Sequence, residues 1–131
     1  MAKGDIQVNI LIVDDDAGNT SALYAGLSSH GYRVIVAEDA GHALRIVENP
    51  KEPHPVDLVL TDLKMPDMNG LELIRAAKEV RPDLPCILMT AFGNDSIRRE
   101  TLALDSCGYV EKPFSPDALL QSIEKLAVRN E

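Results

Sequence analysis

The sequence lacks any apolar run long enough to cross a membrane. A spanning helix needs ~20 consecutive apolar residues, and every apolar stretch in this chain is far shorter. The opening segment MAKGDIQ also lacks the hydrophobic region of a secretory signal. We therefore expect no transmembrane helix, no export and a cytoplasmic location.

Positive charge is scarce as well. The chain has 13 Lys and Arg residues against 21 Asp and Glu residues, which gives a net charge of −8. Because nucleic acid is bound through a basic surface, direct binding to nucleic acid is disfavoured. A metal cation or a basic patch on another protein suits this charge better.

Cysteine and histidine are few and show no metal-ligand pattern. Cys86 and Cys107 form no C-x-x-C motif, and the three histidines have no ligand spacing. This usage suits a reducing compartment. We interpret both cysteines as small apolar core residues.

What the chain does have is a regular alternation of short apolar runs with segments of helical length and spacing. The expected strands are 8–13, 34–37, 56–61, 86–90 and 109–112. The expected helices are about 17–30, 39–49, 71–80, 95–104 and 115–128, with the fourth polar and weakly periodic. This alternation predicts an α/β fold, a doubly wound five-stranded parallel sheet with helices on both faces. At 131 residues, one domain is expected over 1–131.

Residues that can carry chemistry stand where these strands end. They are Asp14, Asp15 and Asp16 after the first strand, Asp62 after the third, Thr90 at the end of the fourth and Lys112 after the fifth. Ligands of such sheets bind beyond the carboxyl ends of the strands. In the flavodoxin-like strand order 2-1-3-4-5, Asp14, Asp15 and Asp62 would meet at one side of a crevice. Thr90 and Lys112 would approach from the other side.

Three crowded carboxylates repel one another, so each is expected to raise the pKa of the others and to favour a bound cation. Oxygen ligands suit Mg²⁺. A hydroxyl and an ammonium opposite the metal would neutralise the oxygens of a phosphoryl group. We therefore interpret Asp62 as a nucleophile that forms an aspartyl phosphate and is exposed so that a phosphodonor can reach it.

Each of these residues also has a simpler interpretation. Asp16 fits a helix N-cap, Thr90 fits the end of a strand, Lys112 fits a surface lysine and Tyr109 fits plain packing. The combination of four strand ends is what favours a phosphoryl site.

The stretches ILIVDDD, VLTDLKMPDMNG, MTAF and GYVEKPF, at these separations, resemble the receiver domain of two-component response regulators. The resemblance covers about 8–128. It implies a signalling switch that catalyses only its own phosphorylation and dephosphorylation. Its phosphoacceptor would be Asp62, modified by a phosphohistidine on a histidine kinase or histidine phosphotransferase.

The resemblance also implies a metal site. Asp15 would be the principal Mg²⁺ ligand, and Asp14 would help directly or through water. Asp62 itself and the backbone carbonyl of Lys64 would complete the protein ligands. Lys64 and Phe92 flank the site and bear on the access of water to the phosphoryl group.

The same resemblance implies the switch residues. Thr90 and Lys112 would contact the phosphoryl group, and the rotamer of Tyr109 would follow Thr90. The signal would then reach the surface of the fourth helix, fifth strand and fifth helix. The Lys112–Pro113 peptide would be cis, and Gly70 would need a positive φ.

Three other functions compete with this one. A pseudo-receiver would only bind proteins, but the acidic pocket and the acceptor are both present here. A phosphatase of the haloacid-dehalogenase type would have an acid two residues after Asp62, where this chain has Lys64. A flavodoxin-type cofactor binder would need a hydroxyl- and glycine-rich loop after the first strand. An effector domain or separate target is expected to receive the signal, whether the chain stands alone or belongs to a longer regulator or hybrid kinase.

Overall fold

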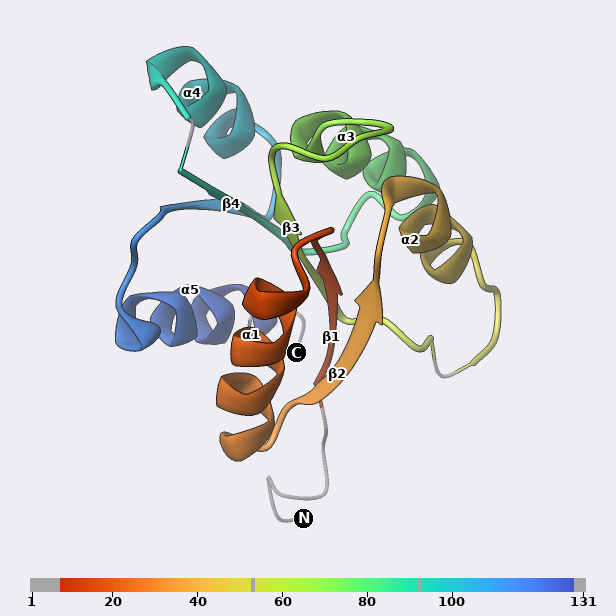
Figure 1. Ribbon diagram of the computed structural model, residues 1–131. Coiled ribbons are helices and arrows are strands. Elements are labelled where there is room, and N and C mark those ends of the chain that lie inside the picture. The colour runs from red at the N-terminus through yellow and green to blue at the C-terminus, as the bar shows by residue number, and fades with distance from the viewer. Residues whose placement is uncertain (1–7, 53, 92, 129–131) are drawn as a thin grey trace.

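The computed structural model describes residues 8–52, 54–91 and 93–128, and strands and helices alternate along them (Figure 1). The strands are β1 (Asn9–Val13), β2 (Arg33–Ala37), β3 (Leu58–Asp62), β4 (Cys86–Thr90) and β5 (Cys107–Glu111). The helices are α1 (Ala17–Ser29), α2 (Ala40–Val47), α3 (Gly70–Val80), α4 (Asp95–Ala103) and α5 (Pro116–Val128). None of the helices in these residues is long and apolar enough to cross a membrane.

The five strands form one parallel sheet in the order β2-β1-β3-β4-β5. This confirms the predicted doubly wound, flavodoxin-like arrangement. β3 begins two residues later than predicted, and β5 begins two residues earlier. β5 begins at Cys107 because its first residues pair with the start of β4, although a Cys-Gly pair has little strand propensity of its own.

Successive residues of the central strands face opposite sides of the sheet, as the pleat requires. Leu11 and Val13 of β1 pack in a cluster with residues of α2 and α3. Ile10 and Ile12 pack in a second cluster with residues of α1 and α5. Figure 1 shows the same division, with α1 and α5 on one face and α2 and α3 on the other. Both faces of β1 are therefore buried, which explains its continuous apolar sequence.

Side-chain caps fix the starts of the helices beside the sheet. Asp16 caps α1 and accepts from two backbone N–H groups of its first turn, at 2.9 and 3.1 Å. Asp39 caps α2, as expected from the sequence. Asn69 caps α3 in a reciprocal box with Glu72. The third aspartate of the Asp14–Asp16 run is thus a helix cap and not a site residue.

The prediction of a positive φ at Gly70 is wrong. In the described part of the chain, φ lies in the left-handed region at Gly31 (91°) and at Ser106 (57°). Gly70 is needed for a different reason, because a Cβ there would collide with the backbone oxygen of Asp62 and lie 2.7 Å from Leu88 Cδ1. Glycine lets the first turn of α3 approach the end of β3.

Candidate functional site

The carboxyl ends of β1, β3, β4 and β5 bring the predicted residues to one edge of the sheet. Val13 and Thr61 are register partners, so Asp14 and Asp62 follow at the same level on neighbouring strands. The backbone N–H of Lys112 donates to the Thr90 carbonyl at 2.9 Å, which holds Lys112 at this edge. The Lys112–Pro113 peptide is cis, as predicted.

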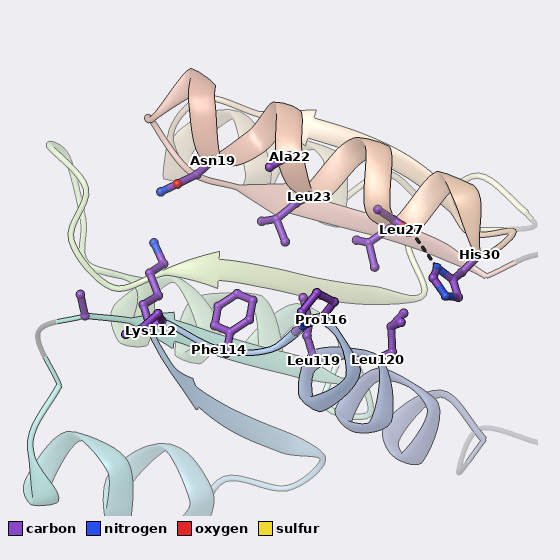
Figure 2. Close-up of a pocket in the computed structure, with 13 residues that line it drawn as sticks. Asn19, Ala22, Leu23, Leu27, His30, Lys112, Phe114, Pro116, Leu119 and Leu120 are labelled. Carbon is purple, nitrogen blue, oxygen red and sulfur yellow. Dashed lines mark hydrogen bonds between the residues drawn. The ribbon is translucent and has the colours of Figure 1, made fainter.

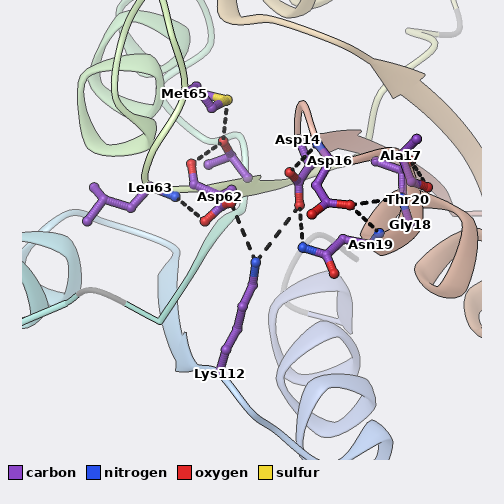
Figure 3. A network of polar contacts seen from close by, with 11 residues as sticks. Asp14, Asp16, Ala17, Gly18, Asn19, Thr20, Asp62, Leu63, Met65 and Lys112 are labelled. Carbon is purple, nitrogen blue, oxygen red and sulfur yellow. Dashed lines mark hydrogen bonds and ion pairs between the residues drawn. The ribbon is translucent and has the colours of Figure 1, made fainter.

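The ammonium of Lys112 lies between two carboxylates, as Figure 3 shows. Its Nζ is 3.5 Å from Asp62 Oδ2 and 3.9 Å from Asp14 Oδ2. The Asp14 side chain is 0% exposed and that of Asp62 is 15% exposed. Asp62 is thus reachable from solvent but largely enclosed, so the expectation of an openly exposed acceptor needs correction.

Asp14 is a buried acid with several partners. Its Oδ1 accepts from the backbone N–H of Asp16 at 2.9 Å, and its Oδ2 accepts from Asn19 Nδ2 at 3.5 Å. Burial raises the pKa of Asp14 above its usual value, and the charge of Asp62 adds to this; the Asp16 N–H, Lys112 and Asn19 oppose it. Desolvation is therefore the main cause of the shift, and repulsion by Asp62 is a smaller one.

The Asp62 carboxylate is oriented by its own neighbourhood. The backbone N–H of Leu63 donates to Asp62 Oδ1 at 2.8 Å, which leaves Oδ2 directed at Lys112. The hydroxyl of Thr61 donates to the Asp62 carbonyl at 2.9 Å. The Leu63 N–H thus orients the carboxylate, and the Thr61 hydroxyl contacts the backbone of the same residue at the end of β3.

Asp15 and Lys64 lie on the solvent side of this site. Both residues are exposed, and Asp15 takes part in neither ion pair of Lys112. The described residues contain no group of three acidic, histidine or cysteine side chains placed to hold a metal ion by themselves. Mg²⁺ usually takes only one or two carboxylates and keeps several waters. The oxygen-only donors of Asp14 and Asp62, with Asp15 beside them, fit that ion.

Thr90 and Tyr109 approach the same loop from different strands. Thr90 is fully buried. A Cβ on Gly93 would collide with the Tyr109 hydroxyl and lie 2.9 Å from Thr90 Cγ2. The Tyr109 hydroxyl donates to Glu111 Oε2 at 3.2 Å. Tyr109 therefore lies against the loop that follows Thr90, in space that a larger residue than Gly93 would fill. Phe92 is outside the described residues.

An apolar groove of about 590 Å³ begins at Lys112 and runs between α1 and α5 toward His30 (Figure 2). Leu23 of α1, Leu120 of α5 and Phe114 just before α5 point into it. Asn19 lies across its mouth from Lys112. The groove thus connects directly with the carboxylate site.

Two residues near the site were missed from the sequence. Asn19 contacts Asp14 from the first turn of α1, five positions later, and its place beside an acidic run was the signal available. Asp67 accepts from the backbone N–H groups of Ala40 and Gly41 at 3.5 and 3.3 Å, and so ties the loop before α3 to the start of α2. Nothing local in the sequence points to that contact, because it joins positions 27 apart.

The response regulator receiver domain model matches residues 10–124. The chain belongs to the response regulator receiver domain family. Receiver domains are signalling switches and not enzymes in the ordinary sense. The fold of this receiver domain has the strand order of its structural relatives.

Named relatives agree with this assignment. The receiver domain is 36% identical to the transcriptional regulatory protein GlrR of Escherichia coli (strain K12) over 118 residues, which are 88% of this chain and 25% of GlrR. It is 36% identical to the response regulator MprA of Mycobacterium sp. (strain KMS) over 124 residues, which are 93% of this chain and 51% of MprA. The chain thus spans about a quarter to a half of these curated relatives.

Solved structures are similar over the full domain. A CheY-like receiver domain protein from Methanospirillum hungatei JF-1 superposes with a TM-score of 0.85 at 32% identity, covering 95% of this chain and 96% of that one. The non-phosphorylated HemR receiver domain of Leptospira biflexa gives 0.78 at 32% identity, covering 92% and 94%.

Proposed function

We propose that this receiver domain is a phosphoacceptor switch in which Asp62 receives a phosphoryl group from a phosphohistidine. The observation that carries the proposal is the position of the Lys112 ammonium, 3.5 Å from Asp62 Oδ2 and 3.9 Å from Asp14 Oδ2. A carboxylate that faces a lysine at the mouth of a groove has both a nucleophilic oxygen and a cation for the incoming charge.

In the proposed reaction an Asp62 carboxylate oxygen forms a bond to phosphorus. The phosphorus–nitrogen bond to the partner's imidazole breaks, and the imidazole nitrogen keeps that electron pair. The hydrogen bond from Leu63 N–H fixes the other carboxylate oxygen. Lys112 can then pair with the negative oxygens of the phosphoryl group. Thr90 is proposed to contact the same oxygens through its hydroxyl.

We assign the Mg²⁺ ligands to Asp14, Asp15, Asp62 and the backbone carbonyl of Lys64. When bound, this ion would neutralise charge on the phosphoryl oxygens. The burial and raised pKa of Asp14 support a cation at this position, because an ionised buried carboxylate needs a compensating charge. Lys112 supplies part of that charge in the arrangement seen.

We propose that a helix of a histidine kinase or histidine phosphotransferase docks on the groove between α1 and α5. The groove is apolar, and it opens beside Lys112, so a helix lying in it could present a histidine to Asp62. The cytoplasm is the proposed location of this transfer. Direct contact with nucleic acid is not expected of this domain, given its net charge of −8.

The proposed output surface is α4, β5 and α5. Thr101 is the one buried residue of α4, all nine residues of which the structure describes. A helix with so little buried surface is weakly anchored, as an element that moves should be. Tyr109 connects this surface to the loop after Thr90. An effector domain or separate target protein would read the change.

Intact-mass analysis with a small phosphodonor tests the proposal. In the presence of Mg²⁺, the wild type should gain one phosphoryl group that hydroxylamine removes, and Asp62→Asn should gain none. Asp83→Asn, which changes an exposed acid away from the site, should behave as the wild type. Equal modification of Asp62→Asn would assign the acceptor elsewhere. An unmodified wild type would favour a protein-binding pseudo-receiver, and rapid phosphate release with turnover would favour a phosphatase.

A further inference from the structure

Cys86 and Cys107 are neighbours across the sheet, although 20 residues separate them in the chain. They are the first residues of β4 and β5, and their Cα atoms are register partners. Directly paired residues of parallel strands project from the same face of the sheet. In agreement, Cys86 lies in the same apolar cluster against which Cys107 packs. Both thiols are free.

This pair lies at the amino ends of the strands, whereas the phosphoryl site lies at their carboxyl ends (Figure 1). Reaction at the thiols therefore needs none of the carboxylates. Cys86 is fully buried, and Cys107 is only partly buried. Solvent and small reagents thus reach Cys107 first.

The surroundings of the pair favour a thiolate at Cys107. The pKa of Cys107 is lowered, mainly by a hydrogen bond with Cys86. The charge of Lys78 lowers this pKa further, whereas burial and the charge of Asp105 raise it. The same thiol–thiol hydrogen bond, with burial, raises the pKa of Cys86 far above its usual value, while Lys78 and Arg81 oppose the rise. Cys107, the less buried of the two thiols, is therefore the easier one to ionise.

The backbone carbonyl of Leu84 holds Lys78 next to the cysteine pair. Its Nζ donates to the Leu84 carbonyl at 2.9 Å, and the Cys86 thiol lies 3.6 Å from the same oxygen. The single S–H of Cys86 can serve either Leu84 or Cys107 at one time. When Cys107 ionises, the stronger acceptor is its thiolate.

We propose that Cys86 and Cys107 are a peroxide-reactive dithiol that closes to a disulfide between β4 and β5. Paired Cα atoms of neighbouring strands are about 4.8 Å apart, within the roughly 4.4–6.8 Å that a disulfide spans. The closed ring would run from 86 to 107 and contain all of α4.

The chemistry balances with a hydroperoxide as the oxidant. The Cys107 thiolate attacks the terminal peroxide oxygen, the O–O bond breaks, and the alcohol or water leaves with a proton; Cys107 becomes a sulfenic acid. Cys86 then attacks that sulfur, and the hydroxyl leaves as water with the proton of Cys86. Overall, the two thiols lose two electrons and two protons and form the disulfide. An organic hydroperoxide is reduced to an alcohol and one water, and hydrogen peroxide is reduced to two waters.

The test uses the reduced full chain and hydrogen peroxide, followed by alkylation of the remaining thiols and mass analysis without reductant. The expected product has lost two hydrogen atoms, contains one peptide pair linked through Cys86 and Cys107, and reverts with dithiothreitol. A sulfinic acid on Cys107 beside a free Cys86, a disulfide between two chains, or two unreacted thiols would each overturn the proposal.

Single variants test the order of reaction. Cys86→Ser should stop at a Cys107 sulfenic acid that dimedone traps, and Cys86→Ala serves the same purpose if serine disturbs the core. Cys107→Ser should leave Cys86 unoxidised at the same peroxide concentration. Oxidation of Cys86 in Cys107→Ser at the wild-type rate would contradict the assignment of Cys107 as the attacking thiol.

Lys78 is a positioning residue, and its role is measured separately through the pH dependence of the reaction of Cys107. Lys78→Gln should slow the reaction of Cys107 several-fold near neutral pH and move its pH–rate profile to higher pH. Lys51→Gln makes the same charge change at an exposed residue in the loop after α2 and should leave the profile unchanged. Identical pH–rate profiles for the wild type, Lys78→Gln and Lys51→Gln would show that Lys78 does not affect the reactivity of Cys107.

Discussion

Lys112 Nζ is closer to Asp62 than to Asp14, at 3.5 against 3.9 Å, although Asp14 is the more deeply buried acid. The lysine therefore pairs best with the carboxylate that solvent can reach. Asp14 keeps part of its desolvation penalty, which appears as its raised pKa. This unequal sharing of one ammonium sets the expected effect of replacing Asp14.

Asp14→Asn should stabilise the metal-free protein. A folded-state pKa above the unfolded value of 3.8 means that ionised Asp14 opposes folding. This penalty is absent below pH 3.8, develops as the pH rises through the folded-state pKa, and is fully present above it. The amide should raise Tm at pH 7 in EDTA by roughly 3–5 °C, equivalent to about 1 kcal/mol. The gain should vanish at low pH, and a lower Tm at pH 7 would mean that the Lys112 pair outweighs burial.

Asp15→Asn should leave Tm in EDTA nearly unchanged, because Asp15 is exposed and outside both ion pairs. The repulsion among Asp14, Asp15 and Asp62 expected from the sequence would instead imply a higher Tm for this variant. In millimolar Mg²⁺ the wild type should be stabilised by about 1.4 kcal/mol at tenfold the dissociation constant, and Asp15→Asn should lose most of this. Thermal melts with and without Mg²⁺ measure both effects, with Asp83→Asn as control. Full Mg²⁺ stabilisation of Asp15→Asn would exclude it as a ligand.

Gly70→Ala should destabilise the fold by about 3 kcal/mol or more, because the new methyl group would collide with the Asp62 backbone, which shifts less easily than the end of a flexible side chain. Gly26→Ala is the matched control in α1, where a Cβ has nothing within 4 Å. That change should stabilise by roughly 0.5–1 kcal/mol, since alanine is the better helix former. Urea unfolding measures the change in the free energy of unfolding for both variants. Equal changes would show that the close approach at Gly70 does not affect stability.

Gly93→Ala should displace the Tyr109 ring and break its hydrogen bond to Glu111. The expected cost is about 1–3 kcal/mol. In a Tyr109→Ala background the same change should cost much less, because the colliding hydroxyl is gone. A double-mutant cycle by urea unfolding measures this coupling. Additive costs would mean that Tyr109 does not occupy the space beside Gly93.

The sequence predicted the sheet from its periodicity and the site from the residues at the strand ends. Continuous apolar runs are typical of buried parallel strands, so the sheet and the meeting of Asp14, Asp62 and Lys112 followed once the strand order was assumed. The cap at Asp16 followed from its place before a helix.

What the sequence did not predict depends on contacts between distant positions. Gly70 is constrained by the Asp62 backbone and not by its own φ. The pairing of Cys86 with Cys107 depends on the register of β4 and β5, which no local pattern encodes. The low exposure of Asp62 and the high exposure of Asp15 likewise depend on the folded surroundings of the two residues and not on the local sequence.

Chemical mapping of the phosphorylated residue tests the central claim most directly. Borohydride reduces an aspartyl phosphate to homoserine, so the wild type would be treated with phosphodonor and Mg²⁺, reduced and mapped by peptide mass analysis. The account predicts homoserine at position 62 alone, with unchanged aspartate at Asp14 and Asp15. Homoserine at position 14 or 15 would contradict it, and so would the absence of homoserine from all three positions.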